Sequence, residues 1–210
     1  RTVVSEDIDL NILTFNDEEG KLAFRHTASH VLAQAVKRLY PEAKLAIGPA
    51  IEDGFYYDFD MAPLTREDLD AIEKEMKKVI KENPPIERYE LPREEAIAYM
   101  KEKDEPYKVE LIEDLPEDAT ISFYKQGDFT DLCAGPHLMS VKPIKAFKLT
   151  ASSGAYWRGN ENNKMLTRIY GTAYTKKADL EERLKYLEEI KLRDHNRLGR
   201  EMELFTTVDV

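Results

Sequence analysis

Four side chains that can bind metal or transfer protons lie in two short motifs. His26 and His30 are four residues apart, and in a helix this spacing puts both on one face, one turn apart. Cys133 and His137 flank a Gly-Pro pair, so bending of the chain can bring them together. The chain has only four histidines and one cysteine, and three histidines with one cysteine are a complete tetrahedral zinc set. We therefore expect the two motifs to form one shared site.

Spacing alone leaves the chemistry of this site open. Each pair by itself could be an incidental surface or buried pair without chemistry. Zinc metalloproteases also use two histidines four apart, but there a glutamate follows the first histidine as general base, and this chain has Thr27 instead. Asp131 precedes Cys133 by two residues, so in an extended strand both side chains point to the same side. A zinc site and a metal-free polar site both fit these residues.

The histidine pair falls inside a predicted helix. Asn16 or Asp17 can cap this helix, acidic residues fill its first turn, and a proline stops it after about Tyr40. A second helix is expected after Thr65, which forms a capping-box pattern with Asp68. Helices therefore precede and follow the first strand-like runs.

The strand-like runs are short and bounded by turn residues. An Asp-Gly turn joins the first two runs, and a third helix could start at Pro92. Alternating apolar positions in residues 1–15 suggest the last strand of an upstream unit, and residues 178–202 read as a charged helix. The strand candidates are 44–49, 55–59, 121–124, 147–149 and 165–174. We predict an α+β fold, an antiparallel β-sheet packed against helices, with a C-terminal charged linker helix.

Composition limits the class of protein. With 210 residues, 42% of them hydrophobic, the chain can form a domain with a sizeable core plus an appendage. No run of 18 apolar residues is present, so we expect no membrane span and no membrane partner. The single cysteine cannot form an internal disulfide, which favours a cytoplasmic location.

The charge is unevenly distributed. The net charge of −10 argues against a nucleic-acid partner. Residues 142–177, however, hold eight basic residues and one acid, a local charge of +7, and leave −17 for the remainder. Phosphate binding needs a local basic face rather than a basic protein. This stretch is either such a face or an ordinary solvated surface.

Taken over whole segments, the sequence resembles the editing domain shared by threonyl- and alanyl-tRNA synthetases. The histidine pair and the Cys-to-His segment look like the paired motifs of that domain, and the sequence between them favours the threonyl branch. The resembling segments are 45–49, 54–58, 106–108, 131–133, 154–159, 163–166 and 168–172. They follow one another along nearly the whole chain, so the resemblance is more specific than either short motif.

The resemblance implies hydrolysis of the ester between serine and tRNA(Thr), which is proofreading during protein biosynthesis. His26 would position water or act as base, Cys133 would orient water or bind the substrate amine, and Lys108 would be a cationic stabiliser. Asp131 and Tyr57 would hold the seryl group or the adenosine. The implied catalytic set is His26, His30, Lys108, Asp131, Cys133 and His137, with Tyr57 as a substrate-binding residue. A thioester on Cys133 would add a step for an activated ester, so we expect direct attack by water.

The same resemblance implies partners and cofactors. The partner is tRNA(Thr), chiefly its aminoacylated 3′ end. Basic residues predicted to contact it are Lys142, Lys145, Arg158, Lys164 and Arg168. Zinc at His26, His30, Cys133 and His137 is the alternative to the metal-free editing site that we favour, because the related alanyl sites are thought to bind it. ATP and a further zinc would belong to the aminoacylation domain of the full enzyme, and the full enzyme would dimerise through that domain.

The resemblance also divides the chain. Residues 1–18 would be the tail of an upstream ubiquitin-like domain, 19–177 the editing domain, 178–203 the linker helix and 204–210 the start of an otherwise absent aminoacylation domain. We therefore expect a fragment of a threonine–tRNA ligase that does not itself charge tRNA. One departure is Ala134, where the family often has Arg, and this change could weaken a contact to the tRNA 3′ end.

Three other functions fit part of the sequence. A zinc-dependent hydrolase unrelated to tRNA would use the same four ligands, but the basic stretch disfavours it. A tRNA-binding module with an inactive pocket would bind without deacylation. A free-standing editing protein is disfavoured by the linker-like helix.

Overall fold

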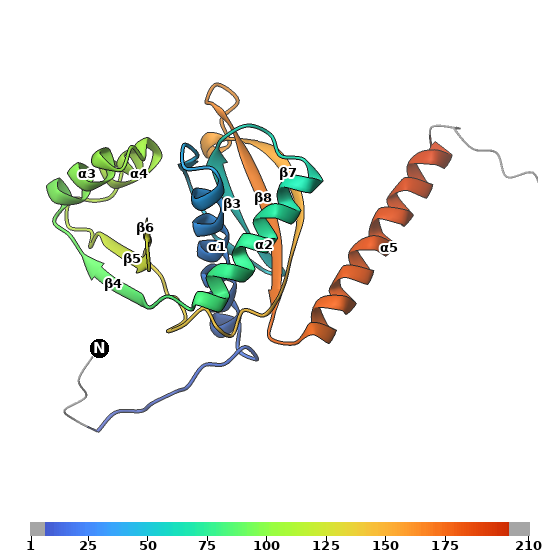
Figure 1. Cartoon of the computed structure of the whole chain (residues 1–210), viewed down its shortest axis with the longest axis horizontal. Helices are drawn as coiled ribbons and strands as arrows, with labels where there is room; N and C mark the ends of the chain where they lie inside the picture. The colour runs from blue at the N-terminus through green and yellow to red at the C-terminus, as the bar shows by residue number, and fades with distance from the viewer. Residues whose placement is uncertain (1–6, 202–210) are drawn as a thin grey trace, which may run out of the picture.

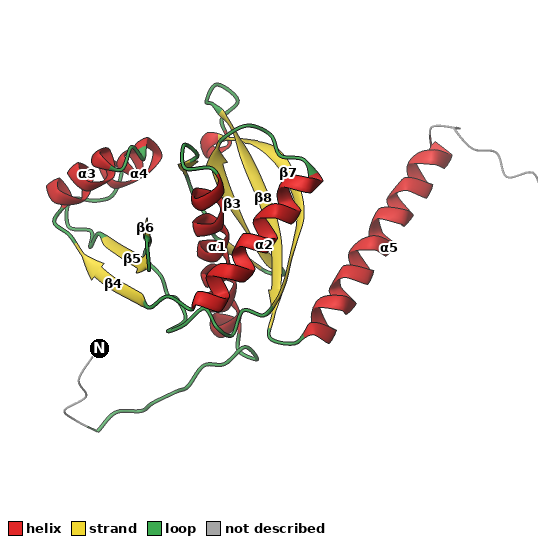
Figure 2. Cartoon of the chain, in the orientation of Figure 1, coloured by secondary structure: helices red, strands yellow, loops and turns green. Residues whose placement is uncertain are grey.

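The structure is a computed structural model that describes residues 7–201, with side chains described to residue 193. Helices and antiparallel strands are both present, which confirms the α+β prediction, and the strands form two separate sheets (Figure 1; Figure 2). Within the described residues no helix is both long and apolar enough to cross a membrane.

Helix α1 (Glu18–Leu39) runs through the centre of the molecule and follows the predicted bounds. Asp17 is its N-cap, two glutamates occupy the first turn, and Lys37 and Arg38 occupy the last turn. Acidic residues at the start and basic residues at the end match the helix dipole. From Phe24 to Val36 nearly every side chain is buried, so this helix is a rigid support for whatever it carries.

The larger sheet has the strand order β1-β3-β8-β7, with β2 paired to β3. Helices α1 and α2 (Arg66–Glu82) pack on one face of it (Figure 1), and the predicted capping box of Thr65 and Asp68 is present. Tyr57 and Phe59 of β3 belong to the core between the sheet and the helices. The strands are β1 (Lys44–Leu45), β2 (Ala50–Ile51), β3 (Gly54–Asp60), β7 (Ala146–Tyr156) and β8 (Met165–Tyr174).

A smaller unit lies beside the unit formed by the larger sheet, α1 and α2, and has its own core. Its sheet, in the order β4-β5-β6, packs with α3 and α4 around Met100, Ile112 and Phe123. Pro92 is the N-cap of α3, as predicted, whereas the sequence analysis did not identify α4, β4 or β6. The elements are β4 (Ile86–Glu90), α3 (Arg93–Glu102), α4 (Pro106–Glu113), β5 (Ser122–Gln126) and β6 (Phe129–Leu132).

The two ends of the described chain differ from the rest. Residues 7–14 form neither helix nor strand, so the strand expected there is not present in the described part, and Leu10 and Ile12 are exposed. Helix α5 (Lys177–Glu201) touches β7 and β8 and then extends away from the other elements (Figure 1). Residues 204–210 lie outside the described residues, and the domain boundaries stay predictions.

Candidate active site

The histidine pair is held on α1 by contacts that leave its side chains little freedom. His26 and His30 lie on one face, with ring centroids 5.2 Å apart, and His30 is 3% exposed. The buried Ser29 hydroxyl lies 2.8 Å from the His26 carbonyl and 2.7 Å from the Gly48 carbonyl, so it ties this turn to the β1–β2 connection. A side chain at position 48 would meet the ring of Tyr57, because a Cβ there would lie 2.0 Å from it.

Cys133 and His137 reach the same place from the loop after β6. The Cys133 amide donates to the Ser122 carbonyl at 3.0 Å, and the Ser122 hydroxyl donates to the Cys133 carbonyl at 2.6 Å. The turn between them needs a glycine, since Gly135 has φ +78° and a Cβ there would lie 2.2 Å from the Tyr124 hydroxyl.

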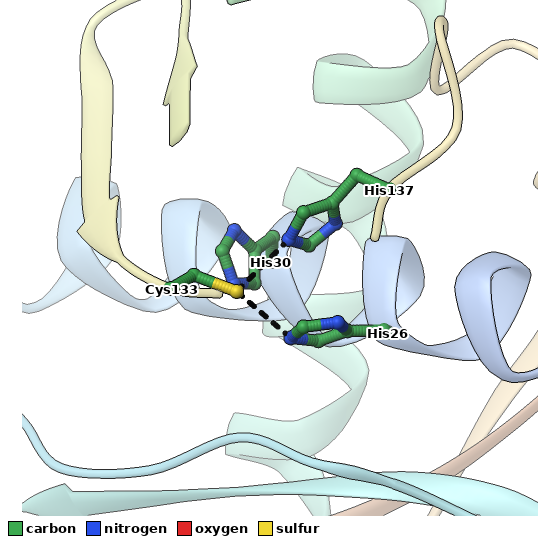
Figure 3. Close-up of side chains that lie close together, drawn as sticks. All are labelled: His26, His30, Cys133 and His137. Atoms are coloured by element: carbon green, nitrogen blue, oxygen red, sulfur yellow. Dashed lines mark hydrogen bonds between the residues drawn. The ribbon is translucent and has the colours of Figure 1, made fainter. Parts of the chain in front are cut away.

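The thiol lies between two imidazoles. Cys133 Sγ is 3.2 Å from His26 Nε2 and 3.3 Å from His137 Nε2 (Figure 3). The His30 ring is 4.1 Å from that of His137, centroid to centroid. One ligand atom from each of the four residues lies within 4.8 Å of the others. The two sequence motifs, 107 residues apart, therefore form one cluster.

A second polar cluster joins the first at His30. Asp131 Oδ1 is 2.6 Å from Lys108 Nζ, and Oδ2 accepts a 2.6 Å hydrogen bond from the Tyr57 hydroxyl. His30 Nε2 lies 3.5 Å from the same Oδ2. These three partners come from α4, β3 and α1, so the carboxylate of Asp131 links the two units of the fold. Lys108, Asp131 and Tyr57 are each at most 3% exposed, so the ion pair is shielded from solvent.

Burial controls the protonation of the cluster. Loss of solvation lowers the pKa of His26, His30 and His137, and mutual repulsion among the rings lowers the pKa of His30 and His137 further. A hydrogen bond to the Pro136 carbonyl and the charge of Asp131 partly oppose this for the pKa of His26. Burial also raises the pKa of Cys133 to about 12. Near neutral pH the site therefore holds three neutral imidazoles and a protonated thiol.

A cavity of about 510 Å³ opens beside these groups. That volume falls in the range of small-molecule sites, roughly 300–1,000 Å³. His26, His30, Lys108, Asp131 and Cys133 contribute to its wall, together with apolar residues from three segments, including Leu22, Ile47, Pro49 and Leu111. Tyr57 is fully buried behind Asp131, so it acts on the cavity through the carboxylate rather than as part of the wall.

The basic residues predicted to contact tRNA do not form one patch. Lys142 and Lys145 are exposed beside the end of α2, where they line a small cavity with Lys81. The other three are paired with acids. Arg158 lies 3.0 Å from Glu110, Lys164 2.7 Å from Asp60, and Arg168 2.7 Å from Asp58. Three of these five basic residues therefore have an acidic partner, and the charge of +7 counted along residues 142–177 overstates the local positive charge.

Two site residues escaped the sequence analysis. Gly48 closes over Tyr57, and Thr27, noted only as the wrong residue for a metalloprotease, contacts His137 and Leu138. The spacing of Thr27 was the available signal, because Thr27 precedes His30 by three residues and residues three apart lie on the same face of a helix.

The four-residue set fits a zinc ion. Two ligands of one tetrahedral zinc lie about 3.5 Å apart, close to the two Cys133–imidazole distances of 3.2 and 3.3 Å. Neutral imidazoles are the form that binds metal. The same distances also suit S–H···N hydrogen bonds, so the geometry accommodates both states.

Comparison with known proteins relates the chain to aminoacyl-tRNA synthetases. Residues 121–170 match the family model of the threonyl and alanyl tRNA synthetase second additional domain. The chain is 66% identical over 203 residues to the threonine–tRNA ligase of Acetivibrio thermocellus, covering 96% of this chain and 32% of that protein. It is 68% identical over 206 residues to the threonine–tRNA ligase of Clostridium tetani, covering 98% of this chain and 32% of that protein. The chain is therefore similar over residues 121–170 to the second additional domain of threonyl and alanyl tRNA synthetases, and nearly all of its sequence is similar to a region that makes up about a third of these two threonine–tRNA ligases.

Proposed function

We propose that this chain hydrolyses serine wrongly esterified to tRNA(Thr). The observation that carries the proposal is the convergence of neutral imidazoles, a thiol and a buried ammonium–carboxylate pair on one cavity of suitable size. These are the groups that ester hydrolysis needs: a base for water, a cation for the developing oxyanion and donors for the leaving oxygen. The similarity to threonine–tRNA ligases supplies the substrate class.

In the proposed reaction, water attacks the seryl carbonyl carbon and the bond to the terminal ribose oxygen breaks. His26 lines the cavity, and its Nε2, which lies 3.2 Å from Cys133 Sγ, takes the proton of the water. The ammonium of Lys108 stabilises negative charge on the carbonyl oxygen. The ribose oxygen then takes that proton from His26, which yields free serine and tRNA and returns His26 to its neutral form. Asp131 holds the Lys108 ammonium in place through an ion pair of 2.6 Å.

Cys133 is assigned to orientation rather than attack. The thiolate is the nucleophilic form of cysteine. Because burial raises the pKa of Cys133 to about 12, almost none of it is thiolate at neutral pH. The thiol instead donates its proton to one of the two neighbouring imidazoles and orients that ring.

A second site of this kind is chemically required wherever threonine must be distinguished from serine. One methyl group contributes only about 1–3 kcal/mol of discrimination in a binding pocket. A hydrolytic cavity that admits serine and excludes threonine by size removes the errors that remain. We place that exclusion in the cavity beside His26.

The proposal predicts selective deacylation. The chain should hydrolyse Ser-tRNA(Thr) much faster than Thr-tRNA(Thr), measured by release of radiolabelled amino acid from each purified substrate. A small ester without tRNA serves as control. Equal hydrolysis of both aminoacyl-tRNAs would contradict the proposal. Binding without hydrolysis would favour a tRNA-binding module with an inactive pocket, and zinc-dependent cleavage of the small ester alone would favour an unrelated hydrolase.

A second prediction concerns metal. We propose that editing works without zinc, although His26, His30, Cys133 and His137 would hold one, and a bound zinc would activate water as a Lewis acid. Protein purified without added zinc should contain less than stoichiometric metal and should keep its deacylase activity after dialysis against a chelator. Elemental analysis and the deacylation assay check this. Stoichiometric zinc together with chelator-sensitive activity that zinc restores would overturn it.

The relatives extend well beyond the region compared, because this chain spans about a third of their length. We propose that it acts as part of a longer threonine–tRNA ligase whose ATP-dependent charging, further zinc site and homodimer contacts reside in the remaining two-thirds. Contact with tRNA(Thr) and a cytoplasmic location belong to the same proposal. The predicted linker role of α5 is compatible with its extension away from the other elements (Figure 1).

A further inference from the structure

The hydroxyl of Thr27 has three neighbours, and their chemistry determines what each contact is. Its oxygen lies 2.7 Å from the Ala23 carbonyl, 2.9 Å from the Leu138 amide nitrogen and 3.2 Å from His137 Nδ1. Thr27 is fully buried, so water does not compete for these contacts. A hydroxyl has one proton to donate and two lone pairs to accept.

Each of these capacities is used once. The Ala23 carbonyl can only accept, so the hydroxyl proton goes to it, as is common for threonine within a helix. The Leu138 amide can only donate, so it takes one lone pair. The remaining lone pair faces His137 Nδ1, which must therefore carry the ring proton. We propose that Thr27 is a positioning residue that holds His137 in the Nδ1-protonated tautomer and leaves its Nε2 bare.

The bare nitrogen matters because of the thiol beside it. His137 Nε2 and His26 Nε2 both lie within hydrogen-bond distance of Cys133 Sγ, at 3.3 and 3.2 Å. The thiol has a single proton, so it can satisfy only one of them. The Gly135 amide also points at Sγ, at 3.2 Å, and takes up a sulfur lone pair.

The cavity decides between the two imidazoles. His26 and the Cys133–Pro136 segment line it, whereas His137 is not part of the lining. If His137 accepts the thiol proton, the lone pair of His26 Nε2 stays free for the attacking water. If His137 were the other tautomer, its Nε2–H would donate to the sulfur. The thiol proton would then be donated to His26 Nε2, and the lone pair of His26 would not be free to accept a proton from water. Thr27 thus keeps His26 available, a role that rests on the proposed deacylation.

The test separates the tautomer from the activity. Chelator-treated full chain labelled with ¹⁵N-histidine is measured by long-range ¹H–¹⁵N NMR at neutral pH, with the four histidines assigned from single His→Gln variants. We expect wild type and Thr27→Ser to show His137 protonated at Nδ1, and Thr27→Val, which has the same shape but no hydroxyl, to show protonation shifted toward Nε2. In deacylation assays Thr27→Val should lose about 10-fold or more in kcat with little change in KM, and Thr27→Ser should stay near wild type.

Several outcomes would overturn the inference. One is an Nε2-protonated His137 in the wild type, which is decisive even if Thr27→Val does not fold. Another is a Thr27→Val protein with the wild-type NMR pattern or with unchanged kcat. If wild type shows the expected tautomer but does not hydrolyse Ser-tRNA(Thr), the proposed function fails while the role of Thr27 in setting the tautomer stands.

Discussion

Replacing His26 with alanine is expected to reduce deacylation of Ser-tRNA(Thr) by about 10²–10⁴-fold, the usual contribution of a positioned general base. The change removes the only imidazole nitrogen that both contacts Cys133 Sγ and lines the cavity among the described residues. The loss should appear in kcat, because the apolar wall of the cavity, which would bind the substrate, remains. Single-turnover hydrolysis of radiolabelled Ser-tRNA(Thr) measures it.

Lys21→Ala is the matched control for this experiment. Lys21 lies on the same helix, more than one turn earlier, and pairs with Glu18 at the surface. Its loss should leave the deacylation rate near wild type. Full activity in His26→Ala, or an equal loss in both variants, would remove His26 from the mechanism. Circular dichroism of each variant shows whether α1 is intact.

The second large effect concerns stability and the buried ion pair of Lys108 with Asp131, the carboxylate that also contacts Tyr57 and His30 of the larger unit. Asp131→Asn leaves the Lys108 ammonium buried without a counter-charge, and breaking a buried pair on one side costs about 3–5 kcal/mol. The hydrogen bond from Tyr57 can persist to the asparagine oxygen, so the loss reports the charge rather than the hydroxyl contact. Urea unfolding followed by circular dichroism gives the change in free energy of unfolding.

The double variant Asp131→Asn with Lys108→Met is the internal control. It removes both charges, and the loss of stability should be smaller than for Asp131→Asn alone, because no unpaired charge stays buried. The exposed pair of Lys21 offers a second comparison, since Lys21→Met should change stability by less than about 1 kcal/mol. A single variant as stable as wild type, or a double variant no better than the single, would contradict this account.

Local sequence signals predicted the helices that have capping residues at their ends. Asp17 and the acidic first turn placed α1, and Thr65 with Asp68 placed α2, because caps act over three or four residues. Helix α4 was missed because its eight residues, between Glu105 and Asp114, have no comparable apolar stripe and depend on packing against α3. Short helices of this kind are stabilised by tertiary contacts rather than by their own sequence.

Part of the candidate site could also be predicted from local spacing in the sequence. Helical spacing placed His26 beside His30, and strand spacing put Asp131 and Cys133 in one short segment. No spacing rule connects Lys108 to Asp131, because that contact depends on how α4 docks against β6. The net charge around the basic stretch could not be read from the linear sequence, since acids distant in sequence, such as Asp58 and Asp60, pair with its Arg168 and Lys164.

The separation of the two motifs also has a consequence during synthesis on the ribosome. Cys133 follows His26 by 107 residues, and bacterial and eukaryotic ribosomes add about 5–20 residues per second. The segment of α1 is therefore made roughly 5–20 seconds before the segment that covers its histidines. During that interval His26 and His30 lack Cys133 and His137, the side chains that contact them in the folded chain.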